Sequence, residues 1–143
     1  MFVDTNVLVK ARILEAPEHI TARASLERAF SDNEPIYISR QILREYLAVM
    51  TRPQTWLVPI SRREAIDDVE RLAVELGVLE DTPEVTDWLI SLCRRVPLGG
   101  RLIHDANIVA TMSAHGERRL LTFNESDFRR FGDHIQIVEE KPA

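Results

Sequence analysis

The sequence predicts a single α/β domain with a mostly parallel central sheet and helices on both faces. Short β-rich runs alternate with longer stretches of helical periodicity, which is the pattern of βαβ units. The length of 143 residues and the hydrophobic content of 45% suit one domain with one substantial core. Because no repeat or linker interrupts the pattern, we expect one domain over residues 1–138 and a C-terminal tail over residues 139–143.

Apolar patterning and turn residues define the elements in the first third of the chain. A short apolar strand ends at Asp4, and the apolar residues that follow repeat at helical spacing. Pro17 breaks this helix, and the polar turn at 31–33 ends a second one. The elements expected here are a strand at 2–3, a helix around 7–11, a helix over 20–30 and a strand at 36–38.

Capping residues define the helices in the middle of the chain. Ser39 suits the N-cap of a third helix, which Pro53 stops. Ser61 and Glu64 have the spacing of a capping box, and Gly77 suits the end of the helix that they begin. Two amphipathic helices are therefore expected in this stretch.

The last part of the chain alternates strands and helices around a glycine loop. Thr82 and Pro83 suit the N-cap and first position of one helix, and Gly116 suits the end of another. The elements expected here are a strand at 78–79, a helix beginning at 83, a loop at 97–100, a helix over 105–115, and strands at 120–123 and 135–138.

The composition predicts a soluble, cytoplasmic protein without a membrane partner. No apolar run approaches the roughly 20 residues that cross a bilayer, and no signal-peptide pattern begins the sequence. Cys93 is the only cysteine, so we expect no internal disulfide, and its apolar neighbours predict a buried thiol.

The net charge of −5 argues against a protein that holds nucleic acid by bulk electrostatics, because phosphates are usually neutralised by Lys and Arg. Any contact with nucleic acid must therefore be local. Lys10 and Lys141 are the only lysines, and the remaining cations are arginines, whose planar fork suits phosphate. A biased coding composition explains this preference equally well.

Acidic and polar residues follow several of the predicted strands. Ligands of parallel sheets bind beyond the carboxyl ends of the strands, and Asp4 lies at such an end. Asp105 begins a helix after the glycine loop, and Thr122, Asn124 and Asp127 follow a late strand. Each residue alone is also typical of a cap, a turn or the first turn of a helix. Their convergence on one point is a hypothesis.

A divalent metal would make such a cluster of acids stable. Glu45 lies close to the apolar face of its helix, where burial of a carboxylate without a partner is costly. Gathered carboxylates repel one another unless a cation is present, and oxygen ligands suit Mg²⁺ or Mn²⁺. With that metal, a site of this kind can hydrolyse a phosphodiester with an activated water.

Four segments in order resemble the successive motifs of PIN domains. These are Phe-Val-Asp-Thr-Asn at 2–6, Ser39 with Glu45 on the following helix, Ile-His-Asp-Ala-Asn-Ile-Val-Ala at 103–110, and Leu-Thr-Phe-Asn-Glu-Ser-Asp-Phe at 121–128. The resemblance covers nearly the whole chain, and the length is similar to that of the VapC toxins of toxin–antitoxin pairs. The fold that it implies is a single PIN-like domain.

The resemblance also implies which acids form the site. Asp4, Glu45 and Asp105 would be the core catalytic acids, with Asp4 and Asp105 as the most direct metal ligands. Glu45 would bind the metal or orient its water. The fourth acidic position varies within the family; our choice is Asp127, with Asn124 as a polar neighbour and the alternative occupant.

Supporting residues and partners follow from the same resemblance. Thr5 and Thr122 are similar to family hydroxyl positions that orient ligands, and both also suit strand-end caps. Arg40 and Arg44, on the helix of Glu45, are the candidates for contact with RNA phosphates. The implied function is Mg²⁺- or Mn²⁺-dependent cleavage of single-stranded or looped RNA by a homodimer that a VapB-like antitoxin inhibits.

Two other classes of α/β protein fit the sequence poorly. A receiver-like signalling domain is expected to carry paired acids after its first strand and a lysine after a late strand. An aspartate-nucleophile phosphatase usually has a second aspartate two residues on, where this chain has Asn6. The remaining alternative is a PIN-like module that binds RNA or protein without cleavage, which the intact acids disfavour.

Overall fold

Five parallel strands form the centre of the structure, a computed structural model that describes residues 1–140. Their spatial order is β3-β2-β1-β4-β5, and every neighbouring pair is parallel, so β1 lies in the middle of the sheet. The strands are β1 (Phe2–Val3), β2 (Tyr37–Ser39), β3 (Gly77–Leu79), β4 (Arg119–Leu121) and β5 (Gln136–Ile137). The predicted parallel sheet is confirmed.

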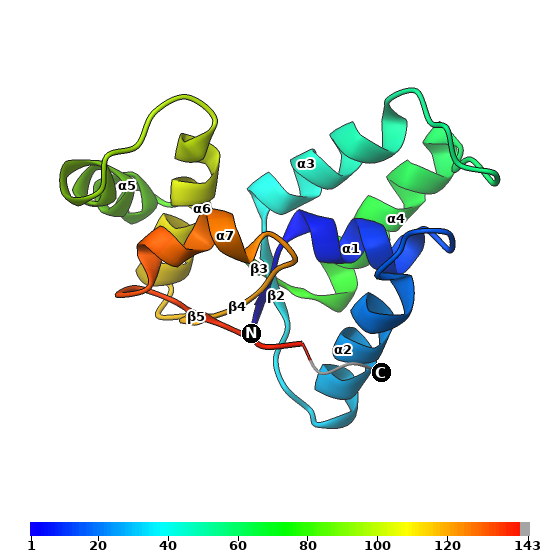
Figure 1. Cartoon of the computed structure of the whole chain (residues 1–143), viewed down its shortest axis with the longest axis horizontal. Coiled ribbons are helices and arrows are strands. Elements are labelled where there is room, and N and C mark those ends of the chain that lie inside the picture. The colour runs from blue at the N-terminus through cyan, green and yellow to red at the C-terminus, as the bar shows by residue number, and fades with distance from the viewer. Residues whose placement is uncertain (141–143) are drawn as a thin grey trace.

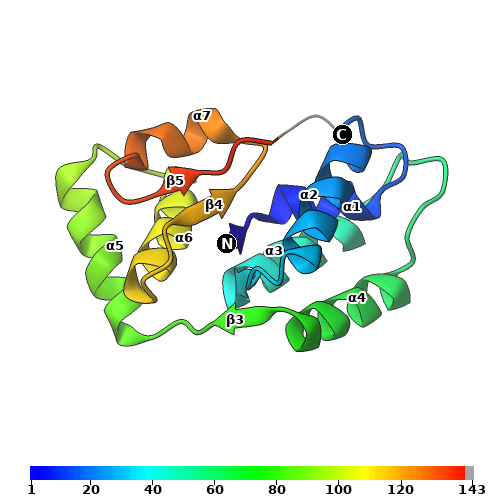
Figure 2. The ribbon, with the colours of Figure 1, turned by 90° about the horizontal axis from the view of Figure 1, so that it is seen from below.

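Helices cover both faces of this sheet (Figures 1 and 2). The group on one side consists of α1 (Thr5–Arg12), α2 (His19–Ser31), α3 (Arg40–Thr51) and α4 (Arg62–Glu75). On the other side α5 (Pro83–Arg95) packs against α6 (Leu102–Ala114), and α7 (Glu125–Phe128) contacts α6. The predicted α/β class with helices on both faces is confirmed.

The core lies between these layers and explains the short strands. Phe2 and Val3 of β1 are fully buried because the strand has a neighbour on each side and helices on each face. Leu120 and Leu121 of β4 are fully buried beside them. A few buried apolar residues in the central strands therefore hold the sheet in place, and polar residues follow β1 and β4 directly at Asp4 and Thr122.

Most predicted helix starts are confirmed by their caps. The Ser39 side chain accepts a hydrogen bond from the Ile42 amide at 3.4 Å and begins α3. Both bonds of the capping box between Ser61 and Glu64 are present at the start of α4. Gly116 ends α6 with a φ of 72°, a conformation that side chains with a Cβ rarely adopt.

Gly77 has a different role from the predicted one. Helix α4 ends at Glu75 with Leu76 as its C-cap, and Gly77 is already the first residue of β3. A Cβ at this position would lie 2.6 Å from Cδ1 of the Tyr37 ring in the neighbouring strand. The glycine is therefore needed for close packing within the sheet and not for a helix end.

Other differences from the predictions are local. Helix α6 begins at Leu102, and β4 ends at Leu121, so Thr122 lies just beyond the strand. The prediction of a buried thiol was wrong, because Cys93 is exposed on α5. Helix α7 and the 3-10 turn Arg129–Phe131 were not predicted, since elements of three or four residues are too short for periodicity to show.

The chain after β5 contains the predicted tail. Residues 139–140 follow β5 without regular structure, while 141–143, the remainder of that tail, lie outside the described residues. Across the described residues, no helix combines the length and the apolar character that crossing a bilayer requires.

Candidate active site

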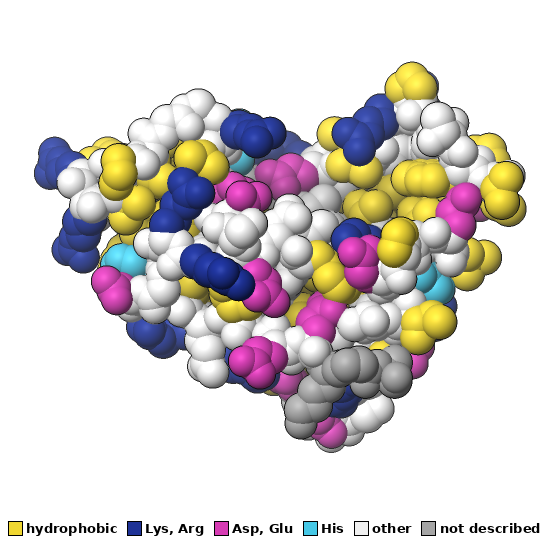
Figure 3. Space-filling view, in the orientation of Figure 1, with side chains coloured by type: hydrophobic (Ala, Val, Ile, Leu, Met, Phe, Trp, Pro, Cys, Tyr) yellow, Lys and Arg dark blue, Asp and Glu magenta, His cyan; other side chains and the backbone are white. Residues whose placement is uncertain are grey.

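The carboxyl ends of the central strands open into a cleft between the two groups of helices. In the space-filling view this appears as a notch with acidic side chains at its floor (Figure 3). The cleft has a volume of about 470 Å³. Six polar residues that line it are Asp4, Thr5, Asn6, Glu45, Asp105 and Asn124.

Asp4 lies at the centre of this group, where β1 passes into α1. Its side chain is only 6% exposed, and its oxygens accept three hydrogen bonds. The donors are the Thr5 amide to Oδ1 at 2.7 Å, and Thr122 Oγ1 and Asn6 Nδ2 to Oδ2 at 2.7 and 2.8 Å. These bonds also make Asp4 the N-cap of α1, so the cap and the site residue are the same side chain.

Burial raises the pKa of Asp4 to about 6. Loss of hydration disfavours the ionised form and is the main cause, while the hydrogen bonds from Thr122 and Thr5 lower the pKa in part. The neighbouring carboxylates of Glu45 and Asp105 raise it further. Asp4 is therefore a buried acid without a cation to balance its charge, and a bound cation would stabilise its ionised form.

Glu45 faces the cleft from α3 and is held by two side chains. Its Oε2 accepts a hydrogen bond from Thr5 Oγ1 at 2.8 Å, and its Oε1 accepts one from Gln41 Nε2 at 2.8 Å. Thr5 thus donates its amide to Asp4 and its hydroxyl to Glu45. The predicted supporting role of Thr5 has a clear geometric form, since one residue fixes two acids.

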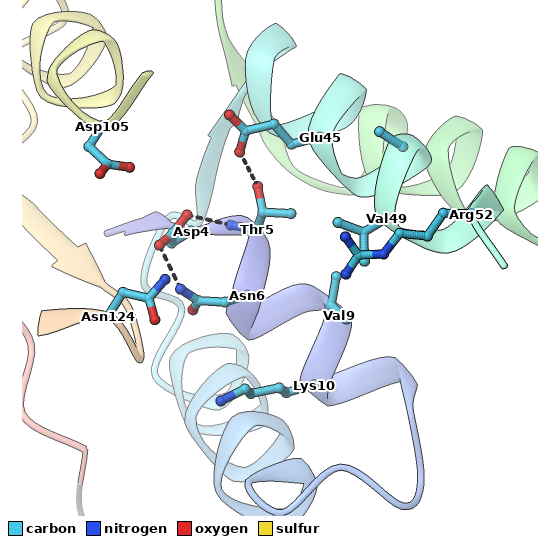
Figure 4. A pocket seen from close by; sticks show the side chains of 11 residues that line it. Asp4, Thr5, Asn6, Val9, Lys10, Glu45, Val49, Arg52, Asp105 and Asn124 are labelled. Carbon is cyan, nitrogen blue, oxygen red and sulfur yellow. Dashed lines mark hydrogen bonds between the residues drawn. The ribbon is translucent and has the colours of Figure 1, made fainter. Parts of the chain in front are cut away.

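Asp105 approaches from the opposite side, on α6. Figure 4 shows it across the cleft from Asp4 and Glu45. Burial raises its pKa, and the charges of Asp127 and Glu45 add to the shift, while Arg130 and His104 oppose it. Three acids, one at the N-cap of α1 and the others on α3 and α6, therefore line one cleft, as the sequence predicts.

The two candidates for the fourth acidic position of the site, Asn124 and Asp127, lie in different places relative to the cleft. Asn124 lines the cleft beside Asp4, and its amide donates to Thr122 Oγ1 at 3.0 Å. Asp127 does not line the cleft, but its charge raises the pKa of Asp105. Asn124 thus lines the cavity directly, and Asp127 acts on the site through its charge on Asp105. The catalytic role of Asp127 stays a prediction.

Asn6 is a structural member of the site that the sequence did not single out. Its Nδ2 donates to Asp4 Oδ2 and, at 3.2 Å, to Thr122 Oγ1, while its Oδ1 accepts from the Phe123 amide at 3.0 Å. One amide side chain therefore joins α1 to the loop after β4. Only its place two residues after Asp4 could have indicated this role.

Gln41 and Asn107 form a second link that the sequence did not reveal. Gln41 is buried, and its Nε2 donates to Glu45 and to the His104 carbonyl at 2.9 Å. Its Oε1 accepts from Asn107 Nδ2 at 2.8 Å, which connects α3 to α6 across the cleft. The spacing of Gln41 four residues before Glu45 is the available signal, because such residues are neighbours on a helix.

The two predicted RNA-contacting arginines lie in different surroundings. Arg40 is bound to Glu80 by two hydrogen bonds, of 3.1 Å from Nε and 2.6 Å from Nη2. Arg44 lines a second cavity that shares Glu45 with the first. Arg44 is therefore near the acids with its guanidinium available, whereas Arg40 is held by an acid.

The donor chemistry of the cleft fits a hard divalent cation. Within residues 1–140 no three His, Cys, Asp or Glu side chains gather closely enough to hold a metal by themselves. Mg²⁺ commonly needs only one or two carboxylates, together with waters and substrate phosphates. A carboxylate has about four lone-pair sites, of which Asp4 uses three, so one site on Oδ1 remains for a cation.

The fold and the site together define an α/β protein with an acidic, oxygen-lined cleft at the carboxyl edge of a parallel sheet. A family model described as the PIN domain matches residues 1–133. The chain belongs to the PIN domain family. The family resemblance identified from the motifs is thereby confirmed.

The relatives with similar sequences are named VapC ribonucleases. The VapC ribonuclease Mb2897 of Mycobacterium bovis is 30% identical over 110 residues, which are 76% of this chain and 75% of the relative. Ribonuclease VapC48 of Mycobacterium tuberculosis is 27% identical over 130 residues, with 90% and 89% of the two chains covered.

Solved structures show the same fold. The VapBC2 complex of Rickettsia felis, bound to a DNA fragment from its promoter, matches with a TM-score of 0.72 at 19% identity over 98% of each chain. VapC20 of Mycobacterium tuberculosis, a toxin that cleaves the sarcin-ricin loop, matches with a TM-score of 0.68 at 18% identity, over 94% of this chain and 95% of that one.

Proposed function

We propose that the protein is a metal-dependent endoribonuclease, the VapC-type toxin of a toxin–antitoxin pair. Its curated relatives are named VapC ribonucleases and cover most of its length. The observation that carries the proposal is the cleft in which Asp4, with its raised pKa, lies with Glu45 and Asp105. None of these three acids forms an ion pair within residues 1–140, so a bound cation would lower the repulsion between them and attract the phosphate of RNA.

The proposed roles follow from how each acid is held. Asp4 and Asp105 are the ligands of Mg²⁺ or Mn²⁺, which when bound supplies positive charge for the phosphate and lowers the pKa of a water. Asp4 is kept in one orientation by Thr122 and Asn6. Glu45, fixed by Thr5 and Gln41, orients the attacking water or accepts its proton.

The proposed partners are single-stranded or looped RNA as substrate and a VapB-like protein as inhibitor. Structures similar in fold include VapBC complexes, some of them bound to DNA. A homodimer and a cytoplasmic location belong to the same proposal. Asp127 is proposed as a residue that tunes Asp105, with Asn124 as the polar neighbour in the cleft.

The test is RNA cleavage by the purified protein. We expect cleavage with Mg²⁺ or Mn²⁺, none with a chelator, and none by Asp4→Asn or Asp105→Asn, while circular dichroism shows that both variants fold. Asp67→Asn, an exposed acid of α4, is the matched control and should cleave normally. Cleavage without metal, or full activity of both site variants, would refute the mechanism. RNA binding without any cleavage would instead support the non-catalytic alternative.

A further inference from the structure

Two cavities meet at Glu45. The cleft of about 470 Å³ continues past the acids to Val9, Val49 and Arg52. A second cavity of about 420 Å³ contains Arg44 and shares only Glu45 with the first. The acids therefore lie at a junction, with space for a chain-like ligand on both sides of them.

Helix α3 gives each of these spaces an exposed arginine. Arg44 precedes Glu45, and Arg52 caps the C-terminal end of the helix. Eight residues separate them, which at the rise of an α-helix is roughly 12 Å along the axis. In Figure 4 the Arg52 side chain extends over the cleft toward Val9. The two guanidinium groups thus lie on either side of the acids along one rigid element.

Both guanidinium groups are available to an anion. Within residues 1–140, neither Arg44 nor Arg52 takes part in an ion pair or a side-chain hydrogen bond. The other cation of the cleft, Lys10, is bound to Glu18 at 2.9 Å, and Arg40 is bound to Glu80. In a chain with a net charge of −5, two free arginines beside the acids provide local attraction for phosphate.

The remaining surface of the two cavities combines apolar and polar side chains and lacks large aromatic rings. Val9 and Val49 line the first cavity, and Leu89 and Ile103 line the second. No Trp, Tyr or Phe within residues 1–140 lines either one. Since base stacking commonly uses such rings, the two arginines are the side chains of these cavities best suited to hold a single strand.

We propose that Arg44 and Arg52 hold the phosphates of a single-stranded RNA on opposite sides of the phosphate that is cleaved. This inference rests on the proposed ribonuclease function and adds the path of the substrate, which runs along α3 with the scissile phosphate at the acids.

The experiment measures how salt affects RNA binding. A fluorescent single-stranded oligoribonucleotide of mixed sequence is titrated with the Asp4→Asn protein, which binds without cleavage, at several salt concentrations. Removing one cation that neutralises a phosphate of a single strand reduces the slope of log K against log salt by about 0.7. We expect this reduction for Arg44→Gln and for Arg52→Gln, and about twice the reduction for both together.

Three comparisons make the result specific. Arg63→Gln, an exposed arginine of α4, is the matched control and should leave the slope unchanged. Arg44→Lys and Arg52→Lys should keep the slope of the parent, since lysine retains the charge. In the cleaving protein, the two glutamine variants should raise KM more than they lower kcat, as expected for contacts remote from the reacting atoms.

The possible failures are distinguishable. An unchanged salt slope in either glutamine variant, or an equal change in Arg63→Gln, would overturn the proposal that Arg44 and Arg52 hold phosphates on opposite sides of the cleaved one. The ribonuclease proposal would stand as long as the parent chain cleaves RNA. A parent chain that neither binds nor cleaves RNA would overturn both.

Discussion

Two aspartates of this protein are equally buried and have opposite surroundings. Asp4 is 6% exposed and Asp68 is 4% exposed. Asp68 accepts hydrogen bonds from Tyr46 at 2.7 Å, Arg12 at 2.9 Å and Arg71 at 3.0 Å, so two cations balance its charge. Asp4 accepts three bonds from neutral donors only and has carboxylates as its charged neighbours.

The difference separates a structural carboxylate from a functional one. Asp68 joins α1, α3 and α4 through side chains that neutralise it, so its burial stabilises the fold. Asp4 lies in a cleft with an unbalanced charge, which is how a site for a cationic ligand differs from a structural network. Hydrogen-bond number does not distinguish the two; the charge of the donors does.

The largest effect is expected from Asp4→Asn. Loss of a residue that only supports a metal ligand typically reduces activity by about 10- to 100-fold, so loss of a direct ligand should reduce kcat/KM for RNA by at least about 100-fold. Thermal unfolding should show a protein at least as stable as the parent without metal, because an unbalanced buried charge is removed. A variant that loses both activity and stability would place Asp4 with Asp68 as a structural residue.

The pH dependence of stability should follow from Asp4. Its pKa in the folded protein, about 6, lies above its ordinary value of 3.8, so the folded state binds this proton more tightly than the unfolded state. The contribution of Asp4 to the free energy of unfolding therefore falls as pH rises from about 4 to 6, by up to about 3 kcal/mol, and stays low above that range.

Urea unfolding without divalent metal, at pH values from 4 to 7, measures this contribution. The parent chain should lose stability relative to Asp4→Asn over that range, and the difference should be constant at higher pH. Parallel curves for the two proteins would show that Asp4 titrates with an ordinary pKa.

Asp68→Asn should lower the stability of the fold and leave cleavage activity unchanged, which is the opposite of what we expect for Asp4→Asn. Hydrogen bonds to charged groups contribute about 1.5–3 kcal/mol, and the variant weakens three of them, so we expect a loss of about 2–3 kcal/mol in the free energy of unfolding. The specific cleavage activity of the folded fraction should be unchanged. Urea unfolding and RNA cleavage on the same sample measure both quantities.

Tyr46→Phe should lower the free energy of unfolding by less than Asp68→Asn does. It removes one hydroxyl donor and leaves Asp68 with both arginines, so the expected loss is about 1.5 kcal/mol, at the lower end for a bond to a charged group. Ser39→Ala, which removes a helix cap instead, should cost about 1 kcal/mol and serves as a reference of similar size. If Tyr46→Phe lowered the free energy of unfolding by more than Asp68→Asn does, the packing of the ring, and not the hydrogen bond of the hydroxyl, would be the main contribution of Tyr46 to stability.

Periodicity and capping residues were sufficient to predict the strands, the long helices and the parallel sheet. The capping box at Ser61 is a local pattern, and the structure contains both of its bonds. Short elements such as α7 and the close approach of Gly77 to Tyr37 depend on contacts between distant segments, which no local pattern records.

The sequence indicated the acids that line the cleft and the supporting threonines Thr5 and Thr122, but not the amide side chains that link the elements. Asp4 and Asp105 stand at strand-end and helix-start positions, where sequence alone draws attention to polar residues. The bond between Gln41 and Asn107 spans 66 residues, and its partners are ordinary helix residues until the fold brings α3 and α6 together. Asp68 was overlooked for the same reason, since only the fold places Arg12 and Tyr46 beside it.

The central place of β1 determines when a growing chain can first act on RNA. Asp4 is synthesised long before its donor Thr122, which follows 118 residues later, after α6 with Asp105 and after β4. A peptide released before Asp105 is made, from a broken message or at a premature stop codon, therefore lacks both Asp105 and Thr122. Under the proposed function, the site is complete only in chains that extend past β4.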